Sequence, residues 1–187
     1  PYILGHSMGA STTTTLAARR PALPRAILLE DPAWRASTPV SPASTSDKVD
    51  QTTENTSWLQ WLLPLRAQPR AERIATERAR SHWVDEELEP WADAKDQFNL
   101  AIMEYNDADS RLRVTSWRED LPQISCPILL VTADPERGAV VTPQVAQEAT
   151  RLWQRGEAVH IPSAGHNIRR EQFEPYMAAI TSFLQRH

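Results

Sequence analysis

The chain has 187 residues, 41% of them hydrophobic and 24% charged, which is an ordinary globular composition for one domain with a hydrophobic core. The formal net charge is −4, and the sequence has no clustered basic face of the kind that nucleic-acid-binding proteins carry, so we expect no nucleic-acid partner. No apolar run approaches the roughly 18 residues that a membrane-spanning helix needs.

Cys126 is the only cysteine, which excludes an intrachain disulfide and a disulfide-stapled secreted scaffold. This is compatible with a reducing compartment, and we expect a cytoplasmic location. The sequence starts at Pro1 without an initiator Met, and residues 2–4 are typical of a buried strand rather than of a leader peptide. We therefore expect the N-terminus of the whole protein, with any targeting signal, to lie upstream.

The first predicted strand, residues 2–4, leads directly into Gly5-His6-Ser7-Met8-Gly9, and residues 10–20 then predict a helix that ends before Pro21. A G-x-S-x-G motif in this context is typical of a nucleophile elbow, a tight strand-to-helix turn that exposes its Ser. We expect Ser7 to be the nucleophile, with small residues two positions to either side avoiding a clash. The backbone N–H of Met8 is the expected oxyanion donor.

The second predicted strand, residues 26–29, is followed by Asp31 and Pro32. Residues 34–120 then break the strand–helix rhythm. A Ser/Thr/Pro-rich stretch, residues 36–46, precedes helix-forming sequence that contains several tryptophans but no convincing strand, so we expect a helical insertion. Within it, Glu86, Glu87 and Glu89 lie near His82 without the spacing of a metal site, and we expect no metal.

The second half of the chain predicts two further strands, residues 128–132 and 158–161. Between them, Thr142 followed by Pro143 indicates the start of a helix that runs to about residue 153. Apolar residues at steps of three and four between residues 173 and 184 predict a final helix that buries one face. Since buried strands alternate with helices, the fold class is α/β with a mostly parallel sheet.

A serine hydroxyl needs a base, and the base needs an orienting carboxylate. We expect His166 to be the base, because it follows the last strand on a loop. The other histidines fit less well: His6 would point away from the serine, and the rest lie in the insertion, in a strand or at the terminus. They are His82, His160 and His187.

Two carboxylates compete for the role of the acid. Asp134 follows the strand at residues 128–132, directly before the strand that leads to His166, and is the preferred acid. Asp31 is the alternative, although it can equally form a turn ahead of Pro32. No phosphate-cradling glycine loop or dinucleotide fingerprint occurs, so we expect no cofactor.

These motifs resemble the α/β-hydrolase superfamily in its serine-nucleophile branch: Ser7 in its elbow, Asp134 after Leu130-Val131-Thr132-Ala133, and His166 after Gly165. The resemblance implies an α/β-hydrolase core at residues 1–33 and 121–187, and a helical lid at residues 34–120 over the site. It also implies hydrolysis of a small-molecule ester or related acyl substrate. A Ser nucleophile argues against the haloalkane dehalogenase and epoxide hydrolase branches of the family, which need a carboxylate.

The beginning departs from the family pattern, in which further strands and a second oxyanion donor precede the elbow. The resemblance therefore implies that this chain is a C-terminal portion, with residues 2–4 at an open sheet edge and with weak or no activity alone. A carbon–carbon bond hydrolase, a perhydrolase and a non-catalytic remnant stay open as alternatives. The sequence indicates no oligomeric state.

Overall fold

The computed structural model describes residues 1–34, 51–81, 83–101 and 116–187. The chain divides into two compact units, which we call the core unit (Pro1–Ser37 with Val114–His187) and the helical unit (Thr38–Arg113). The predicted Ser/Thr/Pro-rich stretch at residues 36–46 and His82 lie outside the described residues.

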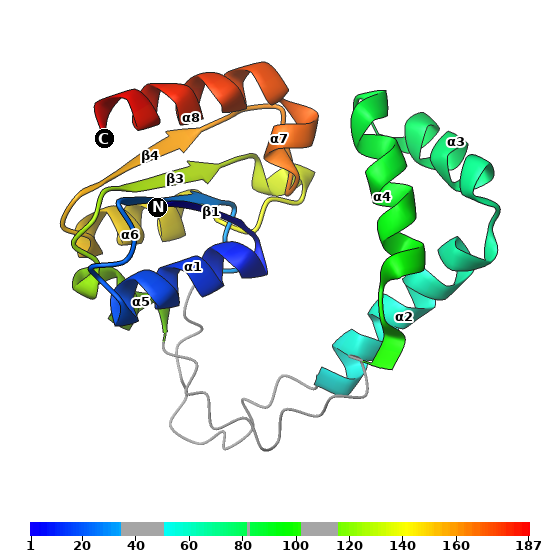
Figure 1. Cartoon of the computed structure of the whole chain (residues 1–187), viewed down its shortest axis with the longest axis horizontal. Coiled ribbons are helices and arrows are strands. Elements are labelled where there is room, and N and C mark those ends of the chain that lie inside the picture. The colour runs from blue at the N-terminus through cyan, green and yellow to red at the C-terminus, as the bar shows by residue number, and fades with distance from the viewer. Residues whose placement is uncertain (35–50, 82, 102–115) are drawn as a thin grey trace. The chain divides into compact units, whose positions relative to one another are not determined.

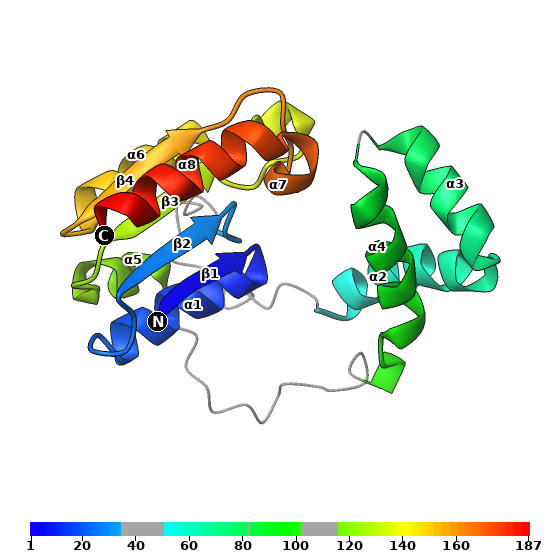
Figure 2. The same cartoon turned by 45° about the horizontal axis from the view of Figure 1, so that its top comes forward.

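The core unit is built on four parallel strands that lie side by side in the order β1-β2-β3-β4 (Figure 2). The two central strands are buried along their whole length, as their continuous apolar sequence predicts. The predicted parallel α/β fold is therefore confirmed, and β1 forms one edge of the sheet. The strands are β1 (Tyr2–His6), β2 (Ala26–Glu30), β3 (Ile128–Thr132) and β4 (Gly156–His160).

Helices cover both faces of this sheet (Figure 1), because successive residues of a strand point to opposite faces. Ile27 and Leu29 of β2 pack with α1 and α6, whereas Leu28 packs with α8 on the other face. The helices of the core unit are α1 (Met8–Arg19), α5 (Trp117–Asp120), α6 (Pro143–Leu152), α7 (Ile168–Glu171) and α8 (Phe173–Arg186), with short 3-10 turns at η3 (Leu121–Gln123) and η4 (Pro135–Arg137).

Trp34 and Trp117 belong to the core unit, although the sequence assigned both to the insertion. Their rings stack with centroids 5.0 Å apart and an interplanar angle of 16°, and Trp34 is only 1% exposed. Both pack against the apolar cluster on the α1 and α6 face of the sheet. The segments that lead into and out of the helical unit therefore lie side by side in the core unit, at Trp34 and Trp117. The insertion is accordingly shorter at both ends than the sequence predicted.

The helical unit contains α2 (Gln51–Ala67), α3 (Arg70–Arg80) and α4 (Asp85–Gln97). Trp91 and Leu88 of α4 form its small core with Ile74 of α3. Arg73 of α3 is 2% exposed and donates to the carbonyl oxygen of Ala92 at 2.6 Å and to the carboxylate of Asp96 at 3.0 Å. A buried guanidinium whose hydrogen bonds cross to α4 fixes how these two helices pack.

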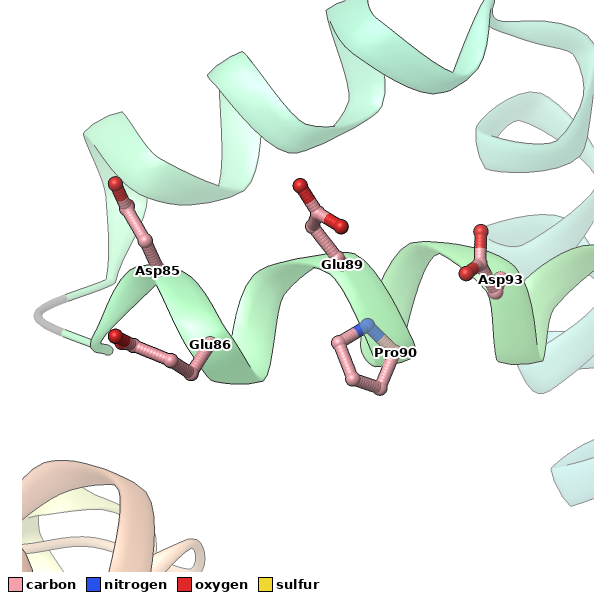
Figure 3. Close-up of a pocket in the computed structure, with 5 residues that line it drawn as sticks. All are labelled: Asp85, Glu86, Glu89, Pro90 and Asp93. Carbon is pink, nitrogen blue, oxygen red and sulfur yellow. The ribbon is translucent and has the colours of Figure 1, made fainter.

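An open, acid-lined depression of about 450 Å³ lies along α4 in the helical unit (Figure 3). Three of its carboxylates are paired with arginines of α3: Asp93 and Glu89 with Arg70, and Asp85 with Arg78 at 2.8 Å. The hydrogen bond from Arg70 lowers the pKa of Asp93 below its usual range. The residues of the depression are Asp85, Glu86, Glu89, Pro90 and Asp93.

Over the described ranges, no helix combines the length and the apolar character needed to cross a bilayer. Within the same residues, no group of three or more His, Cys, Asp or Glu side chains could hold a metal ion.

Candidate active site

Ser7 lies at the turn between β1 and α1 with a backbone φ of 56° and ψ of −122°. A non-glycine residue at positive φ is uncommon and costs conformational energy, so the surroundings must hold it there. They do so by hydrogen bonds: the Ser7 N–H donates to the carbonyl oxygen of Glu30 at 3.0 Å, and the Ser7 carbonyl accepts from Ala10 and Ser11 in the first turn of α1. This is the strained turn that the motif predicts.

The two glycines of the motif differ in what they do. A Cβ at Gly5 would overlap the carbonyl oxygen of Gly9 and lie 2.6 Å from the backbone nitrogen of Ala10, so only glycine lets β1 and α1 approach this closely. A Cβ at Gly9 would meet nothing within 4 Å. The expectation that both glycines avoid a clash therefore holds for Gly5 and is wrong for Gly9 among the described residues.

We expect Gly5→Ala to lower the free energy of unfolding by about 3 kcal/mol, because backbone atoms rather than flexible side chains must move to make room. Gly9→Ala is the matched control. It should leave stability unchanged or raise it by up to about 1 kcal/mol, since alanine favours the helix. Urea unfolding of both variants measures this. Equal stability of the two proteins would contradict the assignment of the close approach to Gly5.

His166 lies next to Ser7, on the loop between β4 and α7, with its Nε2 2.9 Å from the Ser7 Oγ. The two residues are 159 positions apart, and the parallel sheet brings them together because both follow the carboxyl ends of strands. The prediction that this histidine meets Ser7 agrees with the geometry. Gly165 permits the loop's path, because a Cβ there would overlap the carbonyl oxygen of Arg137.

Asp31, and not Asp134, contacts the other nitrogen of the imidazole. Its Oδ2 lies 2.6 Å from the Nδ1 of His166, and its side chain is fully buried. The carboxylate also accepts hydrogen bonds from the backbone N–H groups of Val140, at 2.8 and 3.1 Å, and Val141, at 2.9 Å. A buried carboxylate is tolerated only when donors surround it, and here both oxygens have them.

Asp134 lies at the end of the neighbouring strand but faces another partner. Its carboxylate contacts the Nε2 of His160 at 3.0 Å and accepts the N–H of Ser163 at 2.8 Å. The sequence preference for Asp134 as the partner of His166 therefore does not match the structure. The reason is local: Asp134 directly precedes the turn η4, and its side chain turns toward the end of β4, where it holds the loop that leads to His166.

Met8 is the first residue of α1 and its side chain is 77% exposed. The first N–H groups of a helix have no carbonyl partner within the helix and carry its positive end. The N–H of Met8 is therefore available to an anionic oxygen beside Ser7, as the sequence predicts. Its role as an oxyanion donor stays a prediction.

Sequence reasoning missed three groups at this site. Two are the backbone N–H groups of Val140 and Val141, which the sequence could not reveal because any residue but proline supplies them. The third is the side chain of His6, which was expected to point away from Ser7. Its Nε2 lies 2.8 Å from the carbonyl oxygen of His166. Its place inside the motif was the only available signal.

A model of the alpha/beta hydrolase family matches residues 1–178. The chain belongs to this family. A comparison with curated proteins finds no match.

Solved structures of other alpha/beta hydrolases share the fold at low identity. A deformylase, Nfo, from Pseudomonas putida S16 is 22% identical to this chain, with a TM-score of 0.65. The match covers 96% of this chain and 65% of the deformylase chain. An E-2-(acetamidomethylene)succinate hydrolase is 20% identical with a TM-score of 0.64, covering 98% of this chain and 66% of its own. The thioesterase domain of the curacin biosynthetic pathway is 20% identical, with a TM-score of 0.59. The match covers 95% of this chain and 63% of the thioesterase chain.

This alpha/beta hydrolase chain thus spans slightly less than two thirds of the length of these solved chains. The α/β-hydrolase fold that the sequence motifs implied is confirmed by the family match and by these neighbours.

Proposed function

We propose that the chain is the catalytic part of a serine hydrolase that cleaves an ester or a related acyl substrate, with Ser7 as nucleophile, His166 as base and Asp31 as the orienting acid. One observation carries the proposal. A continuous path of hydrogen bonds runs from the Ser7 Oγ through both nitrogens of His166 to a fully buried carboxylate. This is the arrangement that raises the reactivity of an otherwise weak hydroxyl nucleophile.

The steps follow from the geometry of these groups. Ser7 attacks the acyl carbon while His166 accepts its proton at Nε2, and the N–H of Met8 binds the oxygen on which negative charge develops. His166 then returns the proton to the leaving group, which departs and leaves an acyl-enzyme on Ser7. Water, deprotonated by the same imidazole, releases the acid. Asp31 keeps the proton on Nδ1 and stabilises the imidazolium in each step.

This chemistry can use Asp31, which follows β2, instead of Asp134, which follows β3. What the imidazole needs is a carboxylate on Nδ1, and Asp31 supplies it at 2.6 Å. The backbone N–H groups of Val140 and Val141 hold this carboxylate in place, because they donate to its two oxygens while Oδ2 also contacts the imidazole.

The chemical class of the substrate is supported by fold neighbours that are named for acyl cleavage, a deformylase and a thioesterase domain. Because the same fold serves many reactions, the substrate itself depends on the groups around the site. The helical unit falls within the insertion that the sequence implied as a lid, and we propose that it has this role. In that unit, Trp91 and Leu88 are buried in its own core, whereas Trp61 is 44% exposed.

A fluorophosphonate probe tests the proposal, since it reacts only with a serine activated by such an array. We expect one adduct per chain, mapped by mass spectrometry to Ser7, and none on protein that has been denatured first. Burst release of p-nitrophenol from p-nitrophenyl acetate should accompany it, as expected for an acyl-enzyme. A native chain that stays unlabelled, or that is labelled on another serine, would contradict the proposal and favour a non-catalytic protein with the same fold.

A further inference from the structure

We propose that His6 is a positioning residue of the active site, which holds His166 in register with Ser7 through a hydrogen bond from its Nε2 to the backbone carbonyl of His166. The inference rests on the proposed function, because it concerns how the catalytic imidazole is placed. The contact is 2.8 Å long and links residues 160 positions apart. The two imidazole rings also lie against each other, with centroids 4.6 Å apart.

The direction of this hydrogen bond is determined by its partner. A backbone carbonyl only accepts, so the proton must be on the Nε2 of His6. Burial lowers the pKa of His6, and the nearby charges of His166 and Arg169 act in the same direction, whereas Glu30 and the hydrogen bond itself oppose them. The ring is therefore neutral near pH 7, with one donor, and that donor is used on His166.

Two neighbouring residues thus contact the same residue at two points. Ser7 contacts the ring of His166 at 2.9 Å, and His6 contacts its backbone at 2.8 Å. Because His6 is the last residue of β1, it is fixed by the sheet, where it pairs in register with Glu30 of β2. The distance between Ser7 and His166 is consequently fixed by β1 as well as by the loop that carries His166.

Two carboxylates also bind the backbone of this loop, but they connect it to elements other than β1. Glu171 accepts from the N–H groups of Gly165, at 2.7 Å, and Asn167, at 3.3 Å, and Asp134 accepts from Ser163. These carboxylates bind the loop to α7 and to the end of β3. Only the contact from His6, among those of the described residues, joins the loop's backbone to the strand that carries the nucleophile.

A matched pair of variants tests the inference. The amide of Gln can place an N–H where the Nε2 of His6 lies, whereas the amide of Asn, one methylene shorter, reaches only the position of Nδ1. We expect His6→Gln to keep the fluorophosphonate labelling rate within about threefold of the parent chain. His6→Asn should lower it about tenfold, the cost of one lost hydrogen bond and a displaced base.

A second measurement does not depend on turnover. The proton on the Nδ1 of His166 should show a far-downfield ¹H NMR resonance, because it is shared with a buried carboxylate at 2.6 Å. We expect Asp31→Asn to remove this signal and thereby assign it. The signal should persist in His6→Gln and broaden or vanish in His6→Asn. His187→Gln is the control for removing a histidine, since the ring of His187 contacts Phe183 of α8 and its backbone accepts a hydrogen bond from Arg25, neither of which is a contact of His166.

The outcomes separate the inference from the function that it rests on. If the Asn and Gln variants label equally fast and show the same resonance, with equal thermal midpoints, the positioning role is wrong. If both variants lose the resonance alike, His6 acts by its ring rather than by its donor, and the inference is also wrong. If the parent chain is unlabelled while the resonance behaves as expected, the proposed function fails and the positioning of His166 stands.

Discussion

Asp31→Asn is expected to lower kcat/KM for an activated ester by about 10⁴-fold, and Asp134→Asn by no more than about tenfold. The carboxylate of Asp31 accepts the proton on the Nδ1 of His166 at 2.6 Å, whereas Asp134 contacts His160 and the backbone of Ser163. An asparagine at position 31 presents either an N–H, which forces the imidazole into the wrong tautomer, or a neutral oxygen, which cannot stabilise the imidazolium.

The pair of variants is closely matched. Both carboxylates follow adjacent parallel strands, both accept backbone N–H groups, and both lie opposite a histidine. Thermal unfolding should show that both variants fold, because the amide keeps an oxygen for the backbone donors. A larger loss of activity in Asp134→Asn than in Asp31→Asn would reverse the assignment and restore the acid that the sequence alone favours.

Ser7→Ala is expected to lower kcat by about 10⁶-fold and to abolish fluorophosphonate labelling, since Ser7 is the residue that brings a hydroxyl to the His166 Nε2 in the part of the chain that the structure describes. Stability should change little. The turn's backbone hydrogen bonds to Glu30, Ala10 and Ser11 involve main-chain atoms, which alanine retains, and alanine at a φ of 56° meets the same steric cost as serine.

Ser11→Ala is the control for this variant. Ser11 lies in the first turn of α1, and its contact with Ser7 is made by its backbone N–H, so its hydroxyl should be dispensable. Hydrolysis rates and intact mass after labelling measure both effects. Residual hydrolysis by Ser7→Ala at more than a few per cent of the parent rate would mean that another nucleophile carries the reaction.

The sequence by itself located the strands, the turn at Ser7 and the histidine that contacts it. Continuous apolar runs identified β2 and β3, because a strand buried on both faces of a parallel sheet can hold few polar residues. The motif around Ser7 identified the turn, because only glycine fits at position 5, where a helix approaches a strand this closely. His166 followed from its place after the last strand. These are local features, so local patterns were sufficient.

Only the tertiary structure decided which carboxylate contacts the imidazole of His166, and that His6 contacts the backbone of the same residue. Asp31 and Asp134 end neighbouring strands, and nothing in their sequence order tells which side chain turns toward residue 166. That choice depends on a positive φ of 37° at Asp31 and on the backbone N–H groups of two valines more than 100 positions away. Contacts between segments so distant in the chain form only when the parallel sheet has placed their loops together at the carboxyl ends of its strands.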